Sequence, residues 1–344
     1  MSIIDQAPSA PPAPPAPPAF LQIEPVGQCN LRCRMCPIQY RADGPPYGPP
    51  AFLDFETYRR LLDQAPQITE LHLQGLGEPL MHPNFFDLVA HAAGRGIRVT
   101  TNSNLTLLVP RLADRCLSSG LSYLHVSLDG VTAETYEYIR VGASYSRVVR
   151  NLEALLAARR RRPHAGMGIG LVMVVMRTNL SEVPDMVVQA ARWGVDDLFI
   201  QHLCHEYRDS ALPHRYENMR SFVEAESLEG ADPALVAEVF RTAAAVAVKL
   251  NVRLRLPGTG SPAPHAKGTR RCDWPWRGAY LSYRGDAMPC CMVSTPDRIN
   301  FGNAAELGLR EVWQNDRYED FRRRLASEEP PDICRSCAVY KGTM

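Results

Sequence analysis

The sequence predicts an α/β fold in which a partial (β/α)6 TIM-like barrel precedes a small cysteine-rich module. Two observations carry this prediction. Short apolar runs alternate with amphipathic stretches about six times between residues 20 and 203, which is typical of a parallel sheet with helices outside it. After Pro257 the sequence changes to a Gly/Pro-rich loop, and a cysteine-rich segment follows from Cys272 to Cys337.

The predicted strands are the six apolar runs, at residues 20–24, 68–74, 97–101, 122–128, 167–176 and 197–203. The predicted helices lie between them, where apolar residues recur at helical spacing, at residues 55–64, 84–94, 109–118, 145–161 and 182–193. One more helix is expected over residues 233–249, because Asp232 can cap its start and Pro233 fits its first turn.

The chain divides into three expected parts. Residues 1–19 end in a proline-rich tract with few donors and little to bury, so we expect a disordered tail there. Residues 20–250 are expected to form the barrel core, and residues 251–344 the second module.

Composition narrows the function classes. The 344 residues are 45% apolar and 22% charged, which is ordinary for a globular protein. The net charge of +1 gives no electrostatic basis for binding nucleic acid or a membrane surface, and no apolar run is long enough to span a bilayer. The start of the chain lacks the features of a secretory signal, so we expect its clustered cysteines to bind metal in a reducing cytoplasm.

Three of the ten cysteines, Cys29, Cys33 and Cys36, occur within eight residues directly after the first predicted strand. Three thiolates at this spacing can hold an iron–sulfur cube and leave its fourth iron without a protein ligand, whereas electron-transfer clusters are normally held by four cysteines. Structural zinc also takes four ligands, so zinc and reduced core cysteines are the weaker alternatives.

In this loop the chain resembles the radical S-adenosylmethionine superfamily, with Met35 where many members have an aromatic residue. The resemblance implies that S-adenosylmethionine chelates the open iron of a [4Fe-4S] cluster. It also implies that an electron breaks the sulfonium bond, and that the resulting 5′-deoxyadenosyl radical abstracts hydrogen from a substrate. Flavodoxin or ferredoxin is the implied electron donor.

The resemblance further implies which residues meet S-adenosylmethionine. The string Gln-Gly-Leu-Gly-Glu-Pro after the second strand looks like the family's motif for the methionine amino group, because its glycines allow close backbone approach and its glutamate can accept from an ammonium group. At the end of the fourth strand, Ser127 and Asp129 share one face. Asn102, after the third strand, is a weaker candidate for contacting the cofactor, and a capping or turn role is an equal alternative for it. The full set of expected contacts is Gly75, Gly77, Glu78, Pro79, Asn102, Ser127 and Asp129.

Polar residues at every second position predict a polar barrel interior. His72 and Gln74 share a face of strand two, and His125 and Ser127 share the matching face of strand four. A packed barrel interior is apolar, so we expect both histidines to line a lumen that holds a polar substrate. Hydrogen bonds between the strand and helix layers are the alternative.

Three later residues are weaker candidates. In strand six the phase is not fixed, so His202 and Gln201 compete for the lumen. Arg177, after strand five, either binds a substrate carboxylate or lies in solvent. Cys204, after strand six, is either a buried small side chain or a thiol that returns a hydrogen atom to a substrate radical, which would make the enzyme an epimerase.

The C-terminal segment resembles the SPASM/twitch extension of radical S-adenosylmethionine enzymes. It contains an isolated cysteine, a Gly-x4-Cys element that begins at Gly285, and a final Cys-x-x-Cys. Zinc is the alternative metal, and Cys291 is the alternative to Cys290. The expected ligands of one auxiliary [4Fe-4S] cluster are Cys272, Cys290, Cys334 and Cys337.

We therefore predict a radical S-adenosylmethionine enzyme of oxidoreductase type that acts on a small polar, carbohydrate- or nucleoside-like metabolite in natural-product biosynthesis. Oxidation, epimerisation and decarboxylation are the expected outcomes. Members that modify ribosomal peptides often carry an added N-terminal domain, whereas a proline tract stands there in this chain. A peptide-modifying or sulfatase-maturing enzyme is therefore the second choice, and a non-catalytic iron–sulfur electron carrier is the alternative from another class.

Overall fold

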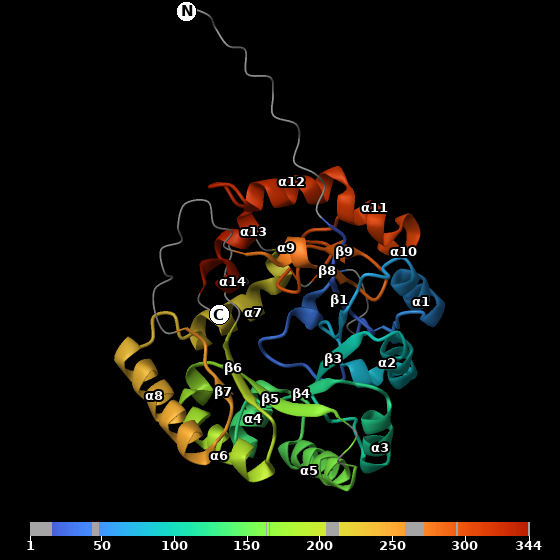
Figure 1. Ribbon diagram of the computed structural model, residues 1–344. Coiled ribbons are helices and arrows are strands. Elements are labelled where there is room, and N and C mark those ends of the chain that lie inside the picture. Colours follow the sequence, from blue (N-terminus) through green and yellow to red (C-terminus); the bar gives the residue numbers. More distant parts are fainter. Residues whose placement is uncertain are drawn as a thin grey trace, which may run out of the picture.

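The computed structural model describes residues 16–42, 48–162, 164, 166–203, 213–258, 272–293 and 295–342. Within them, one nine-stranded sheet has the order β7-β6-β5-β4-β3-β2-β1-β8-β9. Its central six strands run parallel in chain order and form the partial barrel that the sequence predicts (Figure 1). Each overlaps a predicted run: β1 (Phe20–Ile23), β2 (Glu70–Leu73), β3 (Arg98–Ser103), β4 (Tyr123–Ser127), β5 (Gly168–Val175) and β6 (Leu198–His202).

Helices cover the outer face of these strands (Figure 1). Six of them match the predicted ranges to within one residue at either end: α1 (Phe55–Asp63), α2 (Phe85–Gly94), α3 (Pro110–Ser118), α5 (Tyr145–Arg161), α6 (Val183–Trp193) and α8 (Pro233–Leu250). The α8 start is as expected, because the Asp232 side chain accepts a hydrogen bond from the Ala234 amide. Two helices were not predicted, α4 (Ala133–Ile139) and α7 (Glu217–Glu226).

The core lies between the strands and these helices. On β4 and β5 the outward residues Leu124, Val126, Ile169 and Leu171 are all buried, and the residues between them are mostly half-buried. Burial of this apolar face is the main source of stability, since burying a large aliphatic side chain contributes about 1.5–3 kcal/mol. It also fixes the phase of the strands, so that the polar positions between the apolar ones face the barrel interior.

The C-terminal module continues the barrel sheet. Strand β8 (Gly278–Leu281) pairs in parallel with β1, and β9 (Ala287–Met288) pairs antiparallel with β8. Strand β7 (Leu254–Arg255) falls in the range expected for the module, but it pairs with β6 at the other edge. The module's helices are short: α9 (Trp274–Arg277), α10 (Ala304–Leu307), α11 (Leu309–Gln314), α12 (Asp316–Leu325), α13 (Asp332–Arg335) and α14 (Ala338–Lys341).

The end of the proline-rich tract lies against the body of the protein. Trp313 of α11 donates from Nε1 to the Ala16 carbonyl at 3.0 Å, and Gln67 donates to the Pro18 carbonyl at 3.2 Å. The Thr69 amide donates to the Ala19 carbonyl at 3.0 Å. The expectation of a disordered tail is therefore wrong for residues 16–19, because these backbone carbonyls find donors on the barrel and the module. Residues 1–15 lie outside the described part.

No helix in the described part of the chain combines the length and the apolar character that crossing a membrane requires.

Candidate active site

The loop that carries the first three cysteines leaves β1 and ends in a short 3-10 turn at Pro37–Tyr40. Its backbone is paired with the segment that ends α4. The Arg32 amide donates to the Val141 carbonyl at 2.9 Å, and the Arg34 amide donates to the Ile139 carbonyl at 3.0 Å. These bonds hold the loop at the carboxyl end of the strands, where parallel barrels place their functional loops.

The three thiols of this loop lie together; Cys33 is buried, and Cys29 and Cys36 are half-buried. Burial raises the pKa of Cys29, Cys33 and Cys36, to about 12 for Cys36. The charge of Cys33 is the second cause at Cys36, and both Cys33 and Cys36 act on Cys29, so the three sulfurs are neighbours. Buried thiols of this kind become thiolates when a metal compensates the charge.

This donor set fits a cluster better than a single ion. All nine cysteines in the described ranges are free, and none is joined in a disulfide. A structural zinc ion takes four protein ligands, whereas this loop offers three thiols. A cubane held by three cysteines keeps one iron open for another ligand.

Asn104 supports the cysteine loop, although the sequence pointed to Asn102. Its side-chain amide lies 3.8 Å from the Cys29 sulfur and donates to the Asn30 side chain at 3.1 Å. Asn102 lies two residues earlier, half-buried on the inner face of β3 and opposite His125 in the strand register. No sequence pattern pointed to Asn104, because it lies beyond the end of β3 (Arg98–Ser103).

Asp129 is bound by two protein partners. It is fully buried, its Oδ2 lies 2.7 Å from the Arg140 Nε, and its Oδ1 accepts from the Val174 amide at 2.8 Å. Arg140 and Asp129 are also the two charges that most affect Cys33. Ser127, at the end of β4, keeps a half-buried position on the inner face. The sequence alternation predicted that Ser127 and Asp129 share one face. The strand ends at Ser127, so this alternation does not extend to Asp129.

The Gly-x-Gly-Glu-Pro motif packs closely against the segment that follows β1. A Cβ at Gly75 would collide with the Glu24 side chain, and one at Gly77 would collide with the Val26 and Gln28 carbonyls. The glycines therefore allow the motif to pack against the end of β1, which is a requirement of the protein itself.

Glu78 joins this motif to β3. It is buried and accepts from the Ser103 hydroxyl at 2.6 Å, from the Asn104 amide at 2.7 Å and from the Leu80 amide at 3.1 Å. Pro79 follows it as the first residue of a 3-10 turn, Pro79–Met81. Burial raises the pKa of Glu78 despite these bonds, and its carboxylate also raises the pKa of Cys29. Glu78 therefore lies beside the cysteine loop.

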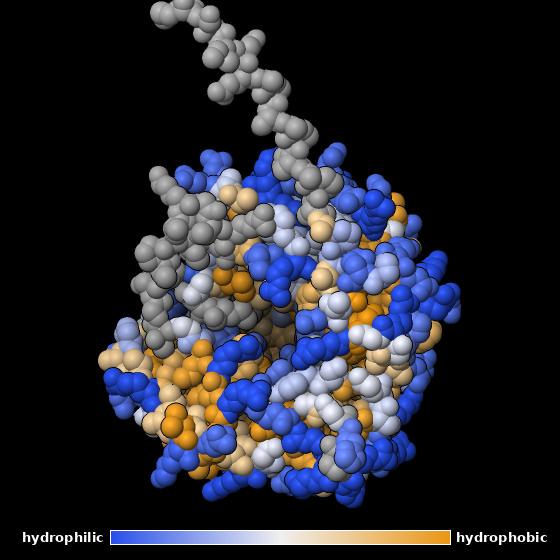
Figure 2. Space-filling view, in the orientation of Figure 1, coloured by the Kyte–Doolittle hydropathy of each residue, from blue (hydrophilic) through white to orange (hydrophobic). Residues whose placement is uncertain are grey.

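The inner face of the sheet carries the polar residues that the strand pattern predicts. The His72 Nδ1 lies 2.7 Å from the Thr100 hydroxyl, and the nearby His125 is one cause of the lowered pKa of His72. Both histidines are half-buried. Figure 2 shows a hollow at the centre of this face of the molecule, where Figure 1 has the open interior of the barrel, and its rim is largely hydrophilic.

Asp197 completes this cluster and was missed from the sequence. It precedes β6, its Oδ1 accepts from the Tyr123 hydroxyl at 2.8 Å, and the same oxygen lies 3.5 Å from the His125 Nε2. Burial raises the pKa of Asp197, but the bonds from His125 and Tyr123 outweigh it, so the net effect is a lowered pKa. Gly170 of β5 leaves the space for this group, since a Cβ there would collide with Asp197. A lone aspartate before a strand carries no sequence signal.

The remaining candidates lie elsewhere. On β6, Gln201 pairs with Val174 in the inward phase, whereas His202 pairs with the outward Val175, contacts the Phe240 ring and lies 3.1 Å from the Gly258 carbonyl. The pairing therefore turns Gln201, and not the candidate His202, toward the lumen, which decides the alternative that the sequence left open. Arg177 is exposed and donates to the Ser227 carbonyl at 3.0 Å. Cys204 lies outside the described residues.

In the C-terminal module the predicted cluster ligands gather around Cys290. Burial raises the pKa of Cys290, and the next causes are the charges of Cys291, Cys337, Cys272 and Cys334. The Cys337 amide donates to the Cys334 carbonyl at 3.2 Å, which makes the Cys-x-x-Cys a tight turn. Cys290, which follows β9, therefore shares one site with Cys272 and with the two cysteines of the C-terminal Cys-x-x-Cys.

The family comparisons agree with this geometry. The profile described as the radical SAM superfamily matches residues 23–190, and the profile described as SPASM, an iron–sulfur cluster-binding domain, matches residues 272–338. The chain belongs to the radical SAM superfamily and carries a SPASM domain. Its cofactors are therefore S-adenosylmethionine and [4Fe-4S] clusters, one of them auxiliary, and it belongs to a family of enzymes.

Known relatives are distant in sequence. The tungsten-containing aldehyde ferredoxin oxidoreductase cofactor-modifying protein of Pyrococcus furiosus is 25% identical, over 93% of this chain and 87% of its own. The PqqA peptide cyclase of Xanthomonas campestris is 25% identical over 83% of this chain and 71% of its own. The structure of Streptococcus suis SuiB bound to S-adenosylmethionine superposes with a TM-score of 0.70 at 16% identity, over 94% of this chain and 72% of its own, and shows the same fold.

Proposed function

We propose that this radical SAM enzyme abstracts hydrogen from an unactivated C–H bond of a peptide substrate. One observation supports the hydrogen abstraction above the others: the three-cysteine loop lies at the carboxyl end of the parallel strands, with its thiols side by side. The relatives named PqqA peptide cyclase support the substrate class, because they match most of this chain. A SuiB structure with its precursor peptide SuiA bound has the same fold, with a TM-score of 0.68.

In this proposal Cys29, Cys33 and Cys36 hold the reactive cluster. When bound, that cluster supplies the electron that cleaves S-adenosylmethionine. Cys272, Cys290, Cys334 and Cys337 hold the auxiliary cluster of the SPASM domain. The chain shields these sulfurs in part, and this desolvation is the largest cause of their raised pKa. Flavodoxin or ferredoxin is the proposed reductant, and the free cysteines suit a reducing cytoplasm.

The His125–Asp197 pair would meet the substrate. The carboxylate lies toward the His125 Nε2, so the neutral ring carries its proton there and presents Nδ1 as an acceptor. An Nδ1 that faces the lumen can bind a hydroxyl or amide proton of the substrate next to the reacting carbon. Tyr123 donates to the same Asp197 oxygen, and its ring centroid lies 4.7 Å from that of His125 in a tilted arrangement, which limits the orientations of both side chains.

The experiment begins with the anaerobically purified chain and has two stages. The first measures iron, expected at about eight atoms per chain for two cubanes, and 5′-deoxyadenosine after reduction with dithionite in the presence of S-adenosylmethionine. The second adds synthetic peptides encoded beside the gene, with deuterated side chains. Deuterium in 5′-deoxyadenosine together with a mass change in one peptide supports the proposal. Cofactor cleavage with no transfer from any of these peptides counts against the substrate class, and zinc without cleavage counts against the reaction.

A small polar metabolite is the second candidate, and the lumen wall favours it. Gln22 donates to Gln74 at 3.0 Å, and His72, His125 and Asp197 add further hydrogen-bonding groups on neighbouring strands. Several separate hydrogen-bonding groups of this kind suit a carbohydrate- or nucleoside-like molecule that is oxidised, epimerised or decarboxylated. Deuterated aminocyclitols, sugars and nucleosides in the same assay distinguish this candidate from a peptide.

A further inference from the structure

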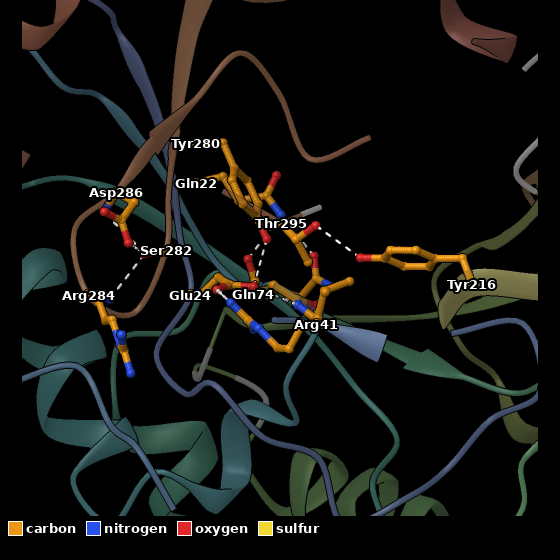
Figure 3. Close-up of polar contacts among 12 residues, drawn as sticks. Gln22, Glu24, Arg41, Gln74, Tyr216, Tyr280, Ser282, Arg284, Asp286 and Thr295 are labelled. Carbon is orange, nitrogen blue, oxygen red and sulfur yellow. Dashed lines mark hydrogen bonds and ion pairs between the residues drawn. The ribbon is translucent and has the colours of Figure 1, made fainter. Parts of the chain in front are cut away.

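Glu24 is a buried carboxylate at the end of β1 with no solvent-exposed surface. Its Oε1 accepts from the Tyr280 hydroxyl at 2.9 Å and from the Leu76 amide at 3.0 Å. Its Oε2 lies 3.1 Å from the Arg41 Nη2 in a fully buried ion pair. Figure 3 shows Arg41 and Tyr280 reaching the carboxylate from different parts of the chain.

Each of the three partners belongs to a different functional segment. Leu76 lies within the Gly-x-Gly-Glu-Pro motif, between Gly75 and Gly77. Arg41 lies in the segment that follows Cys36, and its charge lowers the pKa of that thiol, so the two are close. Tyr280 lies on β8 of the SPASM domain and 256 positions from Glu24 in the sequence.

Tyr280 also faces the auxiliary cysteines. It is buried, it packs in one cluster with Met288 and Val293, and Cys290 and Cys291 lie against that cluster. A second tyrosine of the same segment, Tyr283, lies with its ring 5.2 Å from the Arg41 guanidinium. The SPASM domain therefore contacts both members of the buried ion pair.

The packing around Glu24 leaves little freedom. A Cβ at Gly75 would collide with its side chain, so the carboxylate fills the space beside the motif. Hydrogen bonds and ion pairs in a site without water are strong when complete and costly when one partner is lost. Loss of any one of the contacts to Tyr280, Leu76 or Arg41 should therefore change the geometry of the other two.

We propose that Glu24 is a positioning residue that couples the SPASM domain to the site where S-adenosylmethionine is bound and cleaved. Its carboxylate ties the motif at Leu76 and the end of the cysteine loop at Arg41 to Tyr280 of β8. Tyr280 thereby controls the cleavage of a cofactor that it does not touch. This inference depends on the proposed function, because it assumes that the Cys29–Cys36 loop is where cleavage takes place.

The decisive variant is Tyr280→Phe, which removes one hydroxyl and keeps the ring. Tyr58→Phe is the matched control, because Tyr58 is equally buried and donates a single bond of 2.9 Å to the Leu88 carbonyl, in the helix layer. We expect Tyr280→Phe to keep its iron and to lower the substrate-free rate of 5′-deoxyadenosine formation about tenfold, since a bond to a charged group is the one lost. Tyr58→Phe should keep the parental rate.

Two further readouts do not depend on turnover. The electron paramagnetic resonance signal of the reduced N-terminal cluster with S-adenosylmethionine should change in Tyr280→Phe and stay parental in Tyr58→Phe. Hydrogen exchange of the peptide that contains Leu76 should become faster in Tyr280→Phe and in Glu24→Gln, because the acceptor of that amide is no longer fixed.

The outcomes separate this inference from the function beneath it. A parental enzyme that lacks iron or does not cleave S-adenosylmethionine overturns the proposed function. A parental enzyme that cleaves it, with a Tyr280→Phe variant that matches it in rate, spectrum and exchange, overturns the role of Glu24 alone. Should Glu24→Gln fail to fold, Tyr280→Phe still decides the question, because it leaves the ion pair in place.

Discussion

Asp129 and Arg140 form a buried ion pair directly beside Cys33, with the Arg140 Nε 2.7 Å from the Asp129 Oδ2. The pair joins the end of β4 to the residue that follows α4, and the backbone of that same segment holds the cysteine loop. Its geometry therefore affects both the stability of the fold and the shape of the loop.

Asp129→Asn is expected to lower the free energy of unfolding by about 3–5 kcal/mol, because it leaves the Arg140 charge buried without a counter-charge. Urea unfolding of the purified chain measures the loss. The exposed Arg115–Asp87 pair is the control, where Arg115→Ala should change the same quantity by less than about 1 kcal/mol. Equal losses in the free energy of unfolding at the two sites would contradict the claim that burial makes the Asp129–Arg140 pair costly to break. The double variant Asp129→Leu/Arg140→Met should recover part of the loss.

His72 should make stability depend on pH. Burial and the neighbouring His125 lower its pKa from 6.5 to about 4, so the folded protein keeps the ring neutral where the unfolded chain binds a proton. The unfolded state therefore holds more protons between these values, and stability is complete above pH 6.5 and falls as the pH drops toward 4. Unfolding midpoints of His72→Gln should vary less across this window. The control is His214→Gln, which removes a ring that is 94% exposed.

The cysteine assignments predict two distinct phenotypes. Cys29→Ser should lower the iron content from about eight to about four atoms and abolish cleavage of S-adenosylmethionine. Cys334→Ser should lower the iron similarly but keep substrate-free cleavage, because the N-terminal cluster remains. Cys290→Ser and Cys291→Ser decide between the two adjacent thiols, since the variant of the true ligand alone should lose iron. Cys116→Ser is the control for replacing a buried thiol, as Cys116 packs against Met167 in the core.

Gly77→Ala is expected to destabilise the protein by about 1–3 kcal/mol, because the new methyl group meets the Val26 and Gln28 carbonyls, which cannot move away as a side chain can. Affinity for S-adenosylmethionine should fall with it, since the motif packs against the start of the cysteine loop.

Gly94→Ala is expected to have the opposite effect on stability. Gly94 ends α2 with no atom within 4 Å of an added Cβ, so alanine should stabilise by about 0.5–1 kcal/mol. Thermal unfolding of both variants checks the contrast in sign.

Much of the fold follows from the sequence because its signals are local. Apolar runs alternate with stretches of helical spacing, and the six main strands and six main helices appear where these patterns place them. Spacing alone also identified the Cys29–Cys36 loop, since three thiols within one short loop must lie close together wherever that loop is. The inward phase of His72 and His125 follows from period two within a single strand.

The site residues that the sequence missed depend on contacts between distant segments. Asn104, Asp197 and Glu24 are single polar residues beyond the end or before the start of a strand, where no period applies. The phase of β6 was likewise open until its pairing with β5 turned His202 outward and Gln201 inward.

The amino-acid sequence by itself determined the alternating strands and helices, the cluster-binding loops and the superfamily, because each depends on neighbours in the chain. Only the tertiary structure decided that β8 joins β1, and that Tyr280 reaches a carboxylate 256 residues away. The reason is physical: pairing across such a distance is set by how the whole sheet closes and by which buried polar groups must be satisfied there, and neither is written in a local pattern.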